Sequence, residues 1–158
     1  MVLTLAAAAC GMGAKERPGH LYALLLRPPH DTTRFEAVAS ARHCAGGGWF
    51  IAGNTRGNGV LIWTRSRQGP STGEFPLLTR GDSVSPRGAM AAARFMIVDA
   101  SRGVTLDSGH VVVDSGARIS ARAMGTGVDA AAGHRVAVEA RFDSVPLLPD
   151  TVACRVQL

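Results

Sequence analysis

Apolar and polar residues alternate in short runs over most of the chain, which is the pattern of β-strands with one buried face. The run "HRVAVEARF" (134–142) is the clearest, because every second residue in it is apolar. Side chains of a strand point alternately to its two faces. We therefore expect an inward set of Val136, Val138, Ala140 and Phe142, and an outward set of Arg135, Glu139 and Arg141.

Further strands are expected at 20–26, 34–44, 47–53, 58–65, 89–98 and 117–123. Pro28 and Pro29 should end the first of these, and "NTRGNG" (54–59) has the Asn and Gly content of a hairpin connection. The alanines of 89–98 favour a helix, but its "RFMIV" ending and the nearby glycines favour a strand, which we predict.

The segment 66–89 is rich in Pro, Gly and hydroxyl residues and is long for a connection in a compact domain. We expect it to cover a sheet edge or to form a contact surface. Its "EFPLL" stretch (74–78) can form a short edge strand, a position that tolerates Pro76.

The triplet Asp-Ser-Gly occurs twice, at Asp107–Gly109 and Asp114–Gly116, on either side of His110–Val113. Asp and Ser bond the local backbone and Gly accepts positive φ, so we predict two turns around a short strand. The rival interpretation is a cation site, but two aspartates are few for calcium, which takes six to eight oxygens. The segment 125–134 is expected to be a connection.

These elements, with no long amphipathic helix between them, predict an all-β fold. The chain has 158 residues, 46% of them hydrophobic and 5% aromatic, so Ala, Val and Leu must fill most of one core. We expect a single β-sandwich or barrel-like domain of short antiparallel strands over 20–158, preceded by an irregular tether over 1–19.

The net charge of +5 comes almost entirely from arginines that are scattered singly along the chain. A nucleic-acid site normally adds clustered basic residues and stacking aromatics, so no nucleic-acid partner is predicted. The five histidines show no metal-ligand spacing, and neither a metal nor a cofactor is predicted.

The start of the chain, "MVLTLAAAAC" followed by Gly11, is apolar and approaches Cys10 through small residues. It resembles the end of a bacterial lipoprotein signal, which implies lipidation at Cys10, export to the periplasm and anchoring at a membrane surface. The alternative is an ordinary N-terminus with a stray cysteine.

Two cysteines remain in the expected domain, Cys44 and Cys154. Alternation in "TVACRVQL" (151–158) predicts a last strand with Cys154 facing inward. An exported domain with two cysteines favours a Cys44–Cys154 disulfide, with two buried free thiols as the alternative.

Two further features have the residue types of a site. "RGDSVS" (80–85) contains the Gly-Asp-Ser of GDS-type esterases, but Ser83 lacks a base at the family's spacing, since Asp129 and His134 do not match it. Trp49 and Trp63 lie in neighbouring strand-like runs, where core packing is the default role and a platform for a small ligand or glycan is the alternative.

Taken together, "LAAAAC" with its following Gly, "GHRVAVEARFDSVPL" and "DTVACRVQL" make the chain similar to small exported bacterial β-sandwich lipoproteins. The resemblance implies a non-enzymatic binding or structural protein, such as a peripheral subunit of a larger membrane complex with a protein partner. A small-ligand or glycan-binding domain and a weak GDS-type hydrolase are the alternatives.

Overall fold

The computed structural model describes residues 17–154, which form ten β-strands and, within that range, no helix. The all-β prediction is confirmed. The strands are β1 (Gly19–Arg27), β2 (Asp31–Cys44), β3 (Trp49–Thr55), β4 (Asn58–Ser66), β5 (Gly73–Pro76), β6 (Arg87–Ile97), β7 (Ala100–Ser115), β8 (Ile119–Asp129), β9 (Arg135–Val145) and β10 (Leu147–Val152).

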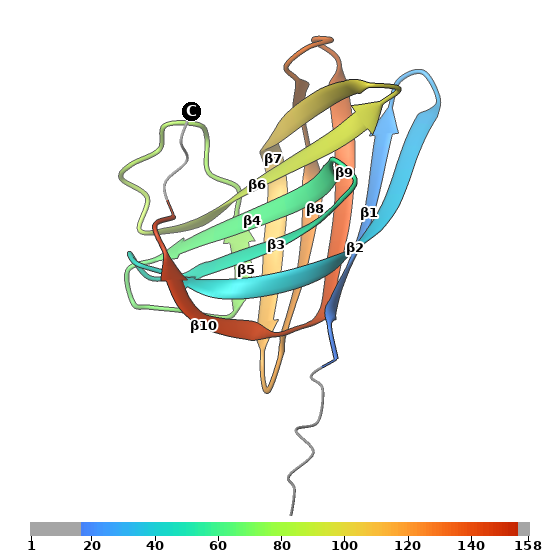
Figure 1. The fold of residues 1–158 in the computed structure, drawn as a ribbon. Coiled ribbons are helices and arrows are strands. Elements are labelled where there is room, and N and C mark those ends of the chain that lie inside the picture. Colours follow the sequence, from blue (N-terminus) through green and yellow to red (C-terminus); the bar gives the residue numbers. More distant parts are fainter. Residues whose placement is uncertain (1–16, 155–158) are drawn as a thin grey trace, which may run out of the picture.

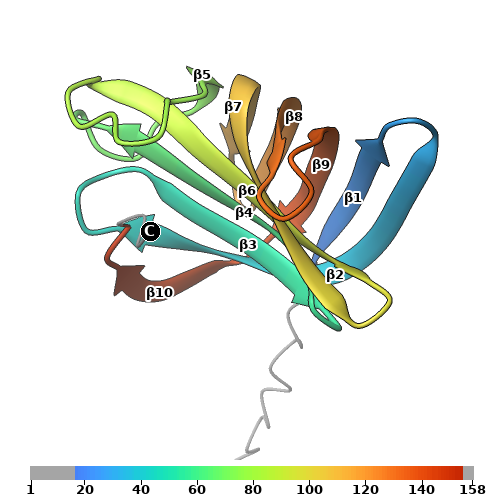
Figure 2. The ribbon, with the colours of Figure 1, turned by 90° about the horizontal axis from the view of Figure 1, so that it is seen from above.

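Eight of the strands close into one antiparallel barrel (Figures 1 and 2). Their order is β1-β9-β8-β7-β6-β4-β3-β2, and pairing of β1 with β2 completes the circle. Of the two architectures expected, the barrel-like one is therefore the arrangement found. Closure removes most free strand edges, which an open sheet would expose to other chains.

Alternation places the inward residues as predicted. Val136, Ala140 and Phe142 of β9 are fully buried, while Arg135, Glu139 and Arg141 face solvent. The other strands add mainly aliphatic side chains and two more phenylalanines to the same core, and the largest fully buried ones are Phe75, Phe95, Phe142, Leu21, Leu25, Ile51 and Ile62.

Two long strands change partner along their length, and an additional strand fills each resulting gap. β7 pairs with β6 over its first part and with β5 over its second. On one edge, β2 pairs first with β1 and then with the parallel strand β10. The segment 66–89 thus does cover a sheet edge, through the predicted short strand that contains Pro76.

The first Asp-Ser-Gly triplet is not a turn, which corrects the prediction. β7 runs through Asp107–Gly109 without a break, and a shift of register between Leu106 and Ser108 marks a β-bulge. The bulge lies where β7 passes from β6 to β5, because an extra residue bends the strand toward its new neighbour. The second triplet does lie at a chain reversal, since β7 ends at Ser115 and β8 follows.

The expected connection over 125–134 is also corrected, because β8 continues to Asp129 and only the residues after it turn. Gly125 and Gly127 are strand residues rather than turn residues. A Cβ atom on Gly125 would lie 2.1 Å from the carbonyl oxygen of Ser108, so the glycine permits close approach of β7 at the bulge.

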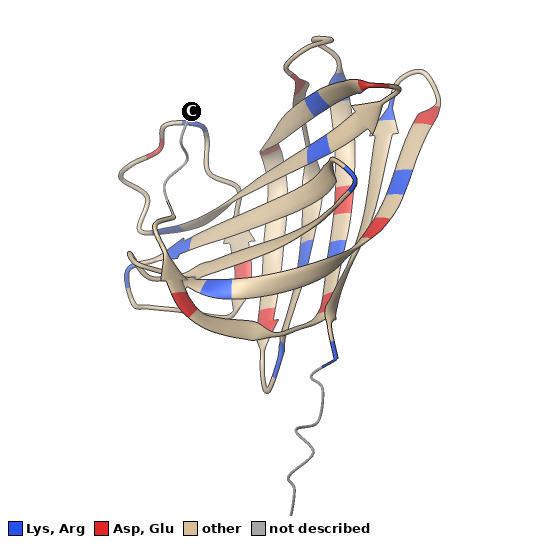
Figure 3. Cartoon of the chain, viewed as in Figure 1, with Lys and Arg blue, Asp and Glu red and all other residues tan. Residues whose placement is uncertain are grey.

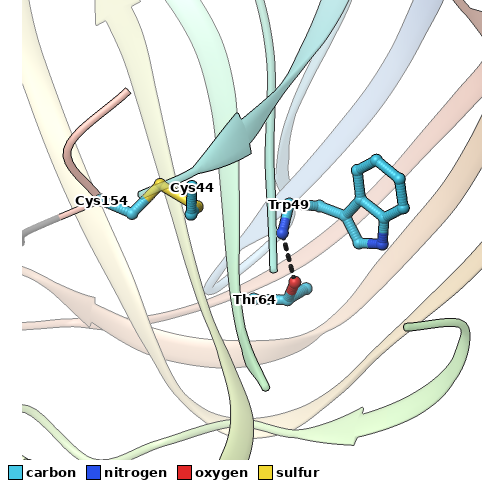
Figure 4. The surroundings of a disulfide bond; sticks show 4 residues. All are labelled: Cys44, Trp49, Thr64 and Cys154. Atoms are coloured by element: carbon cyan, nitrogen blue, oxygen red, sulfur yellow. Dashed lines mark hydrogen bonds between the residues drawn. A yellow bond between two sulfur atoms is a disulfide. The ribbon is translucent and has the colours of Figure 1, made fainter. Parts of the chain in front are cut away.

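The predicted Cys44–Cys154 disulfide is present, with a Cα–Cα distance of 5.3 Å across 110 residues of sequence (Figure 4). It joins the end of β2 to the chain just after β10, beside Trp49, whose backbone N–H donates to Thr64 Oγ1 at 2.8 Å. The last strand, expected over 151–158, is found at Leu147–Val152 instead, so Cys154 follows the strand rather than occupying its inward face; residues 155–158 lie outside the described range.

Candidate functional site

The inner faces of the strands meet in one packed core, so side chains fill the barrel interior. Leu21, Leu25, Ile51 and Ile62 have no exposed surface, and Phe95 and Phe142 are equally buried. Accessible chemistry therefore lies on the outer surface of the barrel and at its two ends. Figure 3 shows that acidic and basic residues are interspersed over the visible strands rather than segregated by sign.

A hollow of about 470 Å³ lies on the outer face of β1, β2, β8 and β9. Cross-strand register explains it: Tyr22 lies opposite Glu36 on one side and opposite Arg141 on the other. Long polar side chains on these four strands surround shorter side chains, and the hollow lies between them. The outward side chains that line the hollow are Tyr22, Leu24, Arg34, Glu36, Arg122, Glu139 and Arg141.

Two contacts orient Arg141, which lines the hollow. Its guanidinium carbon lies 5.0 Å from the centre of the Tyr22 ring, and its Nε lies 3.0 Å from Asp143 Oδ2. Tyr22 is 36% exposed, so its ring remains available to another molecule. Tyrosine and arginine are enriched at the energetically important centres of protein interfaces.

The same part of β2 carries a free strand edge. One edge of Asp31–Val38 pairs with β1, but pairing with β3 begins only at Ala39, and no described strand pairs with the other edge before it. Where β7 leaves β6, β5 pairs with the vacant edge, and where β2 leaves β1, β10 does so. No strand among residues 17–154 pairs with this edge of β2. The edge is therefore open to an added strand.

The orientation of the backbone groups at this edge can be assigned. Ala41 N–H donates to Pro146 O, on the β1 side of β2. Val38 O lies toward β3, 3.1 Å from the ideal Cβ position of Gly53. Because backbone groups alternate along a strand, the N–H and C=O groups of Arg34 and Glu36 point to the open edge.

The two tryptophans have different surroundings. Trp49 is only 6% exposed, its Nε1 donates to Ser71 O at 2.9 Å, and His43 stacks on it at 4.9 Å, so it belongs to the core. Trp63 faces outward on β4, between Phe50 and Met90 of the neighbouring strands. Of the two tryptophans, only Trp63 therefore lies on the outer surface, where a ligand could stack on it.

The RGDS segment is an ordered loop held by its own aspartate. Asp82 Oδ1 accepts the backbone N–H groups of Val84 and Ser85, and its Oδ2 lies 2.6 Å from the Ser85 hydroxyl. Arg65 donates to the Asp82 and Ser85 carbonyl oxygens. The Ser85 hydroxyl, then these backbone N–H groups and the Arg65 charge, lower the pKa of Asp82 from 3.8 despite opposing desolvation.

This arrangement uses Asp82 to close the loop and leaves Ser83 exposed, with no hydrogen-bonded base among the described residues. Within residues 17–154 no group of three or more His, Cys, Asp or Glu side chains is placed to hold a metal ion. The same residues include no helix with the length and apolar character to cross a membrane. Cys10 lies outside the described range.

Comparison with known proteins finds no matching family model, and neither a curated protein nor a solved structure matches the chain. The site is therefore interpreted from its own geometry.

Sequence reasoning missed the hollow and the open edge. The alternation in β9 did place Arg141 on an outward face, whereas no face was predicted for Tyr22 in β1. The alternation does not reveal that β1 pairs with β9, and this pairing brings residues more than 100 positions apart into register. The open edge is a property of strand order alone, and no local residue pattern marks it.

Proposed function

We propose that this protein is a non-enzymatic domain, exported and held at a membrane by lipid on Cys10, that binds a protein partner through β2 and the adjacent hollow. In this role it acts as a peripheral subunit of a larger membrane complex. The observation that carries the proposal is the open edge of Asp31–Val38 beside the Tyr22 hollow.

An open strand edge favours a polypeptide partner over a small molecule. Its N–H and C=O groups repeat along the strand and are matched by another extended backbone, which then gains side-chain contacts on the sheet face. Here that face carries Tyr22 and the cations of the hollow, together with Val38, which is 64% exposed. An added strand would cover Val38 and the partly buried Phe35.

The anchored arrangement is consistent with the position of β1. Gly19 begins β1 nine residues after Cys10, which allows a tether of at most roughly 30 Å. The described chain enters the barrel at the end opposite the β1–β2 turn (Figure 1), so that turn would face away from the membrane. The disulfide supports an oxidising compartment outside the cytoplasm.

A small ligand or glycan bound at Trp63 is the second candidate. The ring lies in a row with Phe50 and Met90, and the Arg65 guanidinium carbon is 5.4 Å from its centre. Trp63 Nε1 is buried without a hydrogen-bond partner among the described residues. The outward-facing ring, rather than this buried donor, is suited to stacking against a sugar ring.

The test is recovery of the native complex from gently solubilised membranes. We expect the protein to carry acyl mass on Cys10 and to co-purify with one protein at fixed stoichiometry. Glu36→Pro removes an N–H that points to the open edge but leaves the β1 ladder intact. We expect at least about tenfold less partner, the loss of roughly 1.4 kcal/mol of binding free energy.

Glu36→Gln is the matched control, because it changes the side-chain charge and keeps the N–H group. Equal partner recovery with the Pro and Gln variants would contradict binding at the edge. An unmodified chain that still begins at Met1 in the native protein would contradict the anchor.

A further inference from the structure

Arg27 is an inward-facing residue at the end of β1, following Leu21, Ala23 and Leu25 in the same phase. Its side chain is only 12% exposed, and its guanidinium carbon lies 5.1 Å from the centre of the Phe95 ring. Nη2 pairs with Asp31. Nε and Nη1 are buried and have no hydrogen-bond partner among the described residues.

Arg102 brings a second cation to the same end of the barrel. It shares the inward phase of Val104 and Leu106 on β7, and it lies directly opposite Phe95 in the β6–β7 ladder. Its Nε is also buried without a partner within the described range. One guanidinium, from β1, therefore lies over the Phe95 ring, and a second, from β7, belongs to the cross-strand neighbour of Phe95 at the same end of the barrel.

Neither nearby carboxylate satisfies these donors. Asp31 is 61% exposed and contacts only Nη2 of Arg27. Asp129 is buried at the end of β8, and its Oδ1 already accepts the backbone N–H groups of Ala131 and Ala132. A buried donor without a partner loses its hydration and gains nothing in return, and the loss is larger for a charged group.

We propose that this end of the barrel binds one small oxyanion between Arg27 and Arg102. A small oxyanion has several oxygens that can each accept one of the free N–H groups. Guanidinium groups bind carboxylate and phosphate oxygens with charge-assisted hydrogen bonds. Asp31 occupies only Nη2 of Arg27, so Nε and Nη1 are left for the anion. The ligand class is a free phosphate or a small carboxylate.

The experiment titrates the folded protein with inorganic phosphate, and separately with acetate, against chloride at equal ionic strength. Isothermal titration calorimetry gives the stoichiometry, and the melting temperature gives an independent reading. We expect saturable binding of one anion and a rise in melting temperature. A response to phosphate alone assigns a phosphate site, and a response to acetate assigns a carboxylate site.

Arg27→Met and Arg102→Met are each expected to weaken binding at least tenfold. Arg118→Met is the control, because Arg118 is only partly buried and donates to Ser144 O near the opposite end of β9. If a Met variant fails to fold, the arginine Nε–H signals of the wild type are followed instead, and those of Arg27 and Arg102 should shift on saturation. Binding that survives both substitutions, or no difference from chloride, would overturn the proposal.

Discussion

Replacing both Cys44 and Cys154 by alanine is expected to lower the free energy of unfolding by about 4–5 kcal/mol. The bridge closes a loop of 110 residues, and in the loop-entropy model a closure of that length restricts the unfolded chain by this amount. For a domain of this size the melting temperature should fall by roughly 10–20 °C. β10 should separate first, since it pairs with β2 alone.

Thermal unfolding with and without reductant measures the effect. Reductant should lower the melting temperature of the wild type to that of the double alanine variant and leave the variant unchanged. If the oxidised wild type and the double variant melt within 2 °C of each other, a threshold well below the loop-entropy value, the bridge does not stabilise the fold as argued.

Gly109→Ala is expected to destabilise the barrel by at least about 3 kcal/mol. Gly109 has a φ of +120°, which L-residues rarely adopt, and an added Cβ would lie 2.0 Å from the carbonyl oxygen of Met124. That oxygen belongs to the β8 backbone, which cannot move without breaking the β7–β8 ladder. Strain and the steric clash therefore add together.

Gly116→Ala is the matched control from the second triplet. A Cβ there meets nothing within 4 Å, so stability should stay the same or rise by up to about 1 kcal/mol. Chemical denaturation of the two variants makes the comparison. Equal stabilities would show that the bulge does not require its glycine.

The strands could be predicted from sequence because each carries its own alternation. Val138 and Ala140 are recognisable as inward residues without knowledge of their neighbours, and the Asn- and Gly-rich "NTRGNG" loop identified the β3–β4 hairpin. Arg56 and Gly57 there both have positive φ, as such a tight connection requires.

The errors arose where one residue type serves two structural purposes. Asp107–Gly109 has the composition of a turn, yet it forms a bulge. Gly109 is required there because β8 approaches closely, and not because the chain reverses. Gly125 misled for the same reason. The inward position of Arg27 was available from its phase with Leu25, but a charged residue at a strand end is easily assigned to solvent.

The candidate sites depend on how the strands pair to close the barrel, and no local sequence pattern indicates that pairing. Tyr22 meets Arg141 only because β1 pairs with β9, and Arg34 faces an open edge only because β3 diverges from β2. The disulfide was predictable because the number of cysteines left few choices.

Amide hydrogen exchange along β2, in the free protein and in its native complex, tests the central claim most directly. The N–H groups of Phe35 and Ala37 point toward β1 and should exchange slowly in both states, while those of Arg34 and Glu36 should exchange rapidly in the free protein. The account predicts that the partner slows exchange at Arg34 and Glu36 selectively. Unchanged rapid exchange at these two positions in the complex would contradict it.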